Sequence, residues 1–227
     1  MKLMDLWRHV IAEWKIKVFL GGAITLAFGW GYFRLARLPE DLATQMPELA
    51  IDRAIPFLPA AAIIYLSQFV TMPAIIWLMG SRRQLLACCR GLALLIAVSF
   101  IIFYGWPTAV VRPELPTGAH FFYGLIASTD LPHNACPSLH AAFAVFTAGC
   151  AWEVFRDWKN GHLLIATAWL WNTAILASTL LTKQHVFLDL IAGSALGAAG
   201  WWTMVDRSAR STEFRSAPAA TSEKAAE

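Results

Sequence analysis

Three long apolar runs without Asp, Glu, Lys or Arg restrict the fold of this chain more than any other feature. They cover Ala54–Ser81, Gly91–Val111 and Asn160–Thr182. A helix of about 20 residues crosses the roughly 30 Å of hydrocarbon in a bilayer, where backbone polar groups must be satisfied within the protein. The runs therefore predict membrane-spanning helices.

Three further apolar segments are shorter or contain a charge: Val18–Phe33, Ser138–Trp152 and Val186–Val205, the last with Asp189. Of the 227 residues, 58% are apolar and only 15% are charged, which is typical of a membrane protein. We therefore predict an all-α, polytopic integral membrane protein with six transmembrane helices.

The two ends of the chain differ from this core. In residues 1–17, apolar side chains recur at helical spacing between charges, which predicts an amphipathic cytoplasmic segment lying in the membrane interface; a solvated leader is the other interpretation. Asp5, Glu13 and the bulky side chains around Trp30 argue against a cleaved signal peptide. Residues 206–227 are rich in Ala, Ser and charge, which predicts a disordered cytoplasmic tail. Residues 18–205 then form a single transmembrane catalytic domain.

The positive charges indicate the orientation of the helices. With both termini in the cytoplasm, most of the 18 lysines and arginines fall on the inner side, and the outer loops hold Arg34, Arg37, Arg53, Arg112 and Lys183. The net charge of +3 follows from this bias, and no basic block with interleaved aromatic residues indicates nucleic-acid binding. The four cysteines do not form a pattern typical of a disulfide framework.

In this topology, three polar clusters lie at the outer ends of helices. They are the segment around Arg112, the motif Pro137-Ser138-Leu139-His140, and the segment from Ser178 to Asp189. Anion-binding and protonatable side chains gathered on one face are typical of a catalytic site. We expect these side chains to line one outward-opening cavity.

His185 and Asp189 are four residues apart, so on a helix they would share one face. A carboxylate that accepts one ring N–H fixes the imidazole tautomer and leaves the other nitrogen free to attack. A carboxylate inside a membrane span is costly unless it is paired, and His185 is the nearest partner. A purely structural Asp–His bond is the alternative.

The Ser138–His140 motif lies at the predicted start of a helix, where free N–H groups and the helix dipole form an anion site. Ser138 could add a hydroxyl donor, and His140 could give a proton to a departing oxygen. The alternative is an N-capping serine beside a bystander histidine. Arg112 alone could be an interfacial arginine whose stem lies along apolar surface.

Together these residues resemble the type 2 phosphatidic acid phosphatase superfamily, which comprises membrane lipid phosphoesterases related to vanadium haloperoxidases. Its signatures are K-x6-R-P, P-S-G-H and S-R-x5-H-x3-D, and the matching positions fall within residues 104–200. The resemblance implies a haloperoxidase-like helical core, a phosphohistidine on His185, orientation of His185 by Asp189, and His140 as general acid. It also implies Arg112, Ser138 and Ser178 as phosphate ligands.

Three positions depart from these signatures: Leu139 stands where the second has glycine, and the other two departures remove positive charge. Gly105 stands where the first signature has lysine, and Thr179 where the third has arginine, so the pocket lacks two cations unless Lys183 replaces one. A phosphodiester has less negative charge than a phosphomonoester and suits such a pocket better. The motifs P-T-A-V-V-R-P, P-S-L-H and T-K-Q-H-x-x-x-D also resemble the inositol phosphorylceramide synthase branch, which transfers a phosphorylated head group between lipids.

We therefore expect a metal-independent lipid phosphotransferase without a cofactor, embedded in a bacterial inner membrane with its site facing the periplasm or exterior. Its partners would be a membrane lipid donor and, for transfer, a lipid alcohol acceptor. A plain phosphatase that releases inorganic phosphate is the main alternative. A proton- or solute-handling transporter would be expected to place its polar groups near the membrane midplane. A metalloenzyme using His133, His140, His185 and Asp189 would lack any H-E-x-x-H motif.

Overall fold

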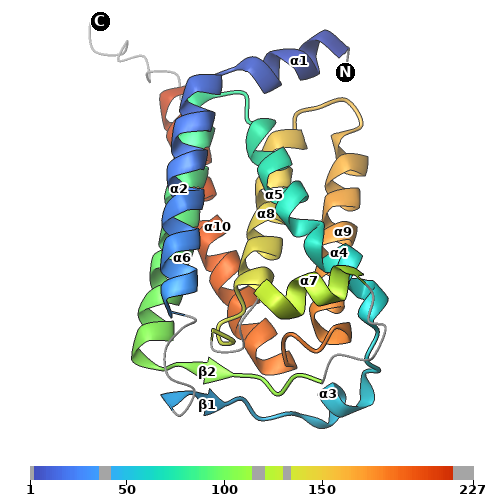
Figure 1. The fold of residues 1–227 in the computed structure, drawn as a ribbon. Coiled ribbons are helices and arrows are strands. Elements are labelled where there is room, and N and C mark those ends of the chain that lie inside the picture. Colours follow the sequence, from blue (N-terminus) through green and yellow to red (C-terminus); the bar gives the residue numbers. More distant parts are fainter. Residues whose placement is uncertain (1–2, 36–41, 114–120, 130–133, 217–227) are drawn as a thin grey trace, which may run out of the picture.

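The computed structural model describes residues 3–35, 42–113, 121–129 and 134–216, and nearly all of its regular structure is helical (Figure 1). The all-α fold class is thus confirmed. In chain order the elements are α1 (Leu3–Ile11), α2 (Trp14–Leu35), β1 (Thr44–Gln45), α3 (Ala50–Ala54), the 3-10 helix η2 (Pro59–Ala61), α4 (Ala62–Leu66), α5 (Gln68–Trp77), α6 (Arg82–Gly105), β2 (Thr108–Ala109), α7 (Phe121–Thr129), α8 (Leu139–Phe155), α9 (Gly161–Leu181) and α10 (Phe187–Ser216).

The long helices run alternately up and down, so that α1 and the end of α10 lie at one end of the bundle and β1, β2 and α3 at the other (Figure 1). Four of the described segments are long and apolar enough to cross a membrane: Trp14–Leu35, Pro59–Trp77, Arg82–Gly105 and Gly161–Leu181. α8 is apolar but has only 17 residues. These helices indicate an integral membrane protein, and the count of six spans stays a prediction.

The third predicted span, Gly91–Val111, is displaced in the structure. α6 begins at Arg82, where the Ser81 hydroxyl accepts a hydrogen bond from the Gln84 N–H at 3.2 Å, and it ends at Gly105. A search for charge-free runs misses the start of this helix, because its first turns contain arginine. Pro107 explains the early end, because proline disfavours helix at the preceding residue and cannot donate a backbone hydrogen bond. Beyond it, Thr108–Ala109 pairs in parallel with Thr44–Gln45.

The second predicted span, Ala54–Ser81, is shorter and less regular than expected. α3 ends at Ala54, and the helical path resumes only at Pro59 and ends at Trp77. Pro56 and Pro59 lie in the interruption, and a proline is well tolerated in the first turn, where Pro59 is found. Pro73 lies within α5, where it removes one helical hydrogen bond.

The two terminal segments differ in how they match the sequence predictions. The N-terminal segment is helical, and α2 begins at Trp14, a few residues before the predicted domain boundary at 18. The Lys17 ammonium group is buried and donates to the carbonyl oxygens of His9 and Trp77, both at 2.7 Å, which joins α1 to the end of α5. Whether α1 lies in the membrane interface stays a prediction.

At the other end, α10 continues to Ser216, so residues 206–216 are helical where the sequence predicted disorder. A helix that is already nucleated extends at little cost through residues such as Ala, Arg and Glu, which explains the difference. Residues 217–227 of the predicted tail lie outside the described part of the chain.

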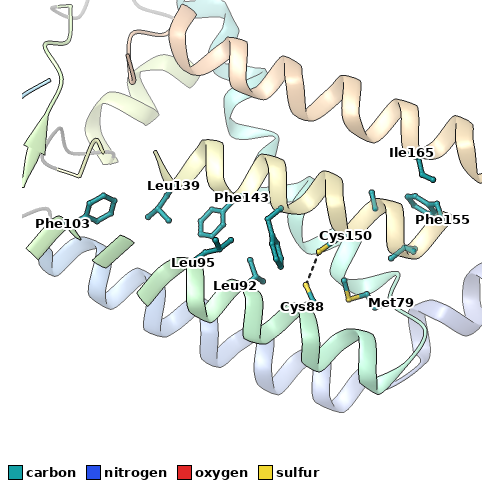
Figure 2. Packing of buried hydrophobic residues seen from close by; sticks show 13 residues of the cluster. Met79, Cys88, Leu92, Leu95, Phe103, Leu139, Phe143, Cys150, Phe155 and Ile165 are labelled. Carbon is teal, nitrogen blue, oxygen red and sulfur yellow. Dashed lines mark hydrogen bonds between the residues drawn. The ribbon is translucent and has the colours of Figure 1, made fainter. Parts of the chain in front are cut away.

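α8 is the central helix of the bundle and packs against α5, α6, α9 and α10. Its Leu139, Phe143 and Cys150 meet Leu95 and Cys88 of α6 in the main apolar core, where the two sulfur atoms are 3.7 Å apart (Figure 2). Large apolar side chains also cover the outside of the bundle, among them Phe19, Leu26, Trp30, Ile101 and Leu170. Such an exterior suits a hydrocarbon surrounding.

Candidate active site

The starts of α8 and α10 bring the two predicted catalytic histidines together. Both helices begin at the end of the bundle that also holds β1 and β2 (Figure 1), and the rings of His140 and His185 have centroids 5.8 Å apart. Ser138 is the N-cap of α8, and its backbone N–H donates to the Asp189 carbonyl oxygen at 3.1 Å. This backbone contact ties the first turns of the two helices to each other.

Two glycines of α10 permit this close approach. A side-chain carbon at Gly193 would collide with the Ser138 carbonyl oxygen, and one at Gly197 with the Ala142 carbonyl oxygen. Gly193 and Gly197 have the G-x-x-x-G spacing that lets membrane helices pack backbone to backbone. The glycine pair therefore fixes how near His185 and Asp189 can come to His140.

His185 and Asp189 form the predicted pair. His185 Nδ1 and Asp189 Oδ2 are 3.1 Å apart, and the side chains are 6% and 0% exposed. The expectation that both lie on one helix face is wrong in detail, because α10 begins at Phe187 and His185 precedes it. Asp189 instead lies in the first turn of α10, where the helix dipole favours a negative charge. With Nδ1 bonded to the carboxylate, Nε2 is the ring nitrogen left for chemistry.

The loop that carries His185 is compact and well bonded. Lys183 adopts a left-handed backbone conformation with φ 54°, which L-residues other than glycine adopt uncommonly. The backbone N–H groups of Gln184 and His185 both donate to the Thr179 carbonyl oxygen, at 3.1 and 3.4 Å. The tight return from α9 thus sets the position of His185 before α10 begins.

His140 has different neighbours from His185. Its Nδ1 lies 3.2 Å from the Tyr65 hydroxyl oxygen, and the two rings stack with centroids 4.1 Å apart. The Gln68 side-chain amide donates to the His140 carbonyl oxygen at 3.0 Å. Our sequence interpretation missed both residues. Gln68 was detectable as a polar side chain inside an apolar span, whereas nothing distinguished Tyr65.

The predicted phosphate ligands are not equivalent in the structure. The Ser138 hydroxyl oxygen accepts from the Ala141 N–H at 3.2 Å, so the N-cap alternative holds for this residue, yet its hydroxyl proton remains available to donate. The Ser178 hydroxyl, by contrast, donates to the Ile175 carbonyl oxygen at 2.6 Å on its own helix. Ser178 would have to break this bond to donate to a phosphate.

Lys183 also contacts protein groups. Its ammonium group donates to the carbonyl oxygens of Asp52 and Ile55, both at 2.6 Å, which leaves one of three N–H groups. The buried Asp52 carboxylate accepts from the backbone N–H groups of Leu49 and Phe187, both at 2.8 Å. Sequence reasoning did not detect Asp52, which joins the α3 segment to the first residue of α10.

Arg112 follows β2 at the same end of the bundle. Val110, two residues earlier, packs in a small buried cluster with Ala135 and Val186, which are close in sequence to Ser138 and His185 respectively. Arg112 is half-buried. A small pocket is lined by Val110, Val111, Lys183 and His185 together with Asp52 of α3.

Cys136 precedes the Ser138 turn and its thiol is buried. Burial, with a further contribution from the nearby Asp189 charge, raises the pKa of Cys136 to about 11. Its backbone N–H donates to the Thr108 hydroxyl oxygen at 2.8 Å. The thiol is therefore neutral near neutral pH, where it is a poor nucleophile.

Within the described ranges, no group of three or more His, Cys, Asp or Glu side chains is arranged to hold a metal ion. His133, named in the metalloenzyme alternative, lies outside these ranges.

This arrangement defines a helical membrane protein with two histidines and a buried carboxylate gathered at one end of the bundle. The family model of the PAP2 superfamily matches residues 85–212, more than half of the 227 residues, and the chain therefore belongs to this superfamily. The searches of curated proteins and of solved structures found no match. Members of the superfamily are phosphatases and phosphotransferases, so the chain is a phosphatase-type phosphoesterase.

Proposed function

We propose that this protein transfers the phosphorylated head group of a membrane lipid through a phosphohistidine on His185, at the outer face of a bacterial inner membrane. The observation that carries the proposal is the buried His185–Asp189 pair set against His140 at one end of the bundle. A histidine whose Nδ1 is held by a carboxylate can use Nε2 as a nucleophile. A second histidine close by can move the proton that the reaction requires.

The reaction takes two displacements at phosphorus. In the first, His185 Nε2 forms a bond to phosphorus while the bond to the lipid alcohol oxygen breaks, and His140 gives that oxygen a proton. In the second, His140 takes the proton from an incoming hydroxyl group whose oxygen bonds to phosphorus as the phosphorus–nitrogen bond breaks. After the two displacements, His185 is again free of the phosphoryl group and His140 is again protonated.

The free N–H groups at the start of α8, the Ser138 hydroxyl and the Arg112 guanidinium group are the proposed ligands of the phosphate oxygens. Lys183 adds a positive charge and one remaining donor. Ser178 is retained as a ligand only in a rotamer other than the one observed. These groups can neutralise the developing charge without a metal ion.

The distribution of cations favours a phosphodiester donor. Lys183, which could replace a missing family cation, donates two hydrogen bonds to backbone carbonyl oxygens next to the buried Asp52 carboxylate. Its charge is thereby partly balanced before substrate binds. A phosphomonoester, with close to two negative charges, is matched less well by this pocket than a diester with one.

The test uses the purified full-length enzyme in vesicles with phosphatidylinositol or phosphatidic acid as donor, each with and without a lipid alcohol. We expect faster turnover of the diester and diversion of product from hydrolysis to transfer when the alcohol is present. Preference for phosphatidic acid, with release of inorganic phosphate whatever alcohol is added, would assign the plain phosphatase activity instead.

A charge-restoring variant probes the reason for this preference. Gly105 has open space around the position of a side-chain carbon, whereas Thr179 is fully buried, so the family lysine can be restored at Gly105 alone. Gly105→Lys should shift the ratio of diester to monoester turnover toward the monoester. Tyr104→Lys adds the same charge at the exposed neighbouring position and should leave the ratio unchanged. An unchanged ratio in Gly105→Lys would contradict the charge-matching argument.

A further inference from the structure

Tyr65 is a polar side chain in contact with His140, the proposed proton carrier, and it comes from outside the family region. It lies on α4, ahead of residues 85–212. Its side chain is 1% exposed, its ring stacks on His140 with an interplanar angle of 33°, and its hydroxyl oxygen is 3.2 Å from His140 Nδ1. A buried hydroxyl needs a hydrogen-bond partner, and the His140 imidazole lies within hydrogen-bond distance of this one.

The two histidines therefore have partners of different chemistry. The Asp189 carboxylate can only accept a hydrogen bond, so it favours a proton on Nδ1 of His185 throughout. A phenol hydroxyl both donates and accepts. It can accept from Nδ1–H of His140 both when the ring is protonated and when the ring is neutral after giving up its Nε2 proton, and unlike a carboxylate it brings no negative charge that would favour the protonated ring. Tyr65 thus suits a histidine that changes its protonation state twice in each cycle.

We propose that Tyr65 is a positioning residue that holds His140 in both protonation states and leaves Nε2 to exchange protons with the leaving and entering oxygens. Gln68 supports the same residue from the backbone side, because its amide donates to the His140 carbonyl oxygen. The inference rests on the proposed function, in which His140 is the proton carrier. It adds an element from the second membrane segment to the chemistry of the family region.

The experiment compares leaving groups in the purified full-length enzyme. Tyr65→Phe removes the hydroxyl and keeps the stacked ring. With a diacylglycerol leaving group, which needs protonation, kcat/KM, which reports the first displacement, should fall about tenfold or more, whereas with a p-nitrophenyl phosphodiester, whose leaving group needs no proton, the loss in kcat/KM should stay below about threefold. Ser67→Ala deletes a hydroxyl on the same segment that bonds Ile64 and Trp171, and it should leave the ratio of the two rates unchanged.

A pH profile distinguishes positioning from a merely structural role. Among the described residues, Tyr65 on α4 and His185 before α10 are titratable side chains in contact with His140, and Asp189 acts on it through His185. In Tyr65→Phe, the limb of the kcat profile that reports His140 should move, while the limb that reports His185 should stay. If Tyr65→Phe does not fold, 3-fluorotyrosine at this position keeps the hydroxyl with a lower pKa and should move the same limb.

His140→Ala in the same assay separates the two levels of the argument. If His140→Ala loses activity selectively with the lipid leaving group but Tyr65→Phe behaves as wild type in rate ratio and pH profile, the role of Tyr65 is wrong and the proposed function stands. If His140→Ala lowers both rates equally, His140 is no proton donor, and both fail. Selective loss in both variants supports the inference.

Discussion

At the residue scale, the chemistry of this site depends on what each histidine contacts. Asp189 occupies Nδ1 of His185 at 3.1 Å, and Tyr65 occupies Nδ1 of His140 at 3.2 Å. Short motifs predicted these two histidines and Asp189, because His185 and Asp189 are four residues apart and His140 belongs to the Pro-Ser-Leu-His motif. The sequence did not predict Tyr65 or Asp52, because their contacts join segments that are far apart in the chain and therefore leave no local pattern.

Asp189→Asn tests the tautomer argument at this scale. Asparagine keeps the shape but removes the acceptor charge and can present an amide N–H to Nδ1, so the wrong ring nitrogen then carries the proton. We expect a loss in kcat of about a hundredfold or more. Asp157→Asn changes a highly exposed carboxylate at the other end of α8 and should be neutral. Near-normal turnover by well-folded Asp189→Asn would contradict the assignment.

The Cys136 thiol provides a prediction about pH. Because burial raises its pKa to about 11, the thiol stays protonated at pH values well below 11 and becomes a thiolate only as the pH approaches that value. N-ethylmaleimide should therefore leave activity unchanged at pH 7.5. Mass spectrometry of the tryptic peptides should show slow labelling of Cys136 that accelerates at higher pH. Rapid labelling at pH 7.5 would show that the thiol is accessible and ionised.

At the element scale, helix ends and helix packing place the site. Apolar runs predicted where helices are found, but the observed helix ends differ from the predicted ones where a cap or a proline is present. α6 starts earlier than predicted, after the N-cap Ser81, and it ends shortly before Pro107. Our sequence analysis did not use the G-x-x-x-G spacing of Gly193 and Gly197, and this spacing alone does not say which helix the glycines face. Elements were therefore more predictable than their ends and partners.

Gly193→Ala tests this packing. The added carbon would meet the Ser138 carbonyl oxygen, so α10 must move away from α8 and carry Asp189 with it. We expect a destabilisation of about 1–3 kcal/mol by thermal unfolding, together with a larger fractional loss of kcat. Gly29→Ala in α2, where nothing lies within 4 Å of the added carbon, is the matched control and should change neither quantity. Equal behaviour of the two variants would mean that close α8–α10 packing is not required.

At the scale of the whole molecule, alternation of the long helices brings the starts of α8 and α10 and the end of α6 to one end of the bundle (Figure 1). This follows from the order of apolar runs, which is why the sequence predicted that the polar clusters converge. The α3 segment could not be predicted as part of the site, because its link to α10 through Asp52 depends on the folded bundle. The superfamily match covers α8, which carries His140, and the loop before α10, which carries His185, and the preceding segment adds Tyr65, Gln68 and Asp52.

The central claim is that His185 carries the phosphoryl group during turnover. The most direct measurement is rapid quenching of the purified enzyme with a phosphate-labelled lipid donor in the presence of EDTA, followed by peptide mapping. The account predicts label on His185 that is stable in base and lost in acid, and it predicts no label and no turnover in His185→Ala. Turnover at a near-normal rate in His185→Ala, or label on a different residue, would contradict it.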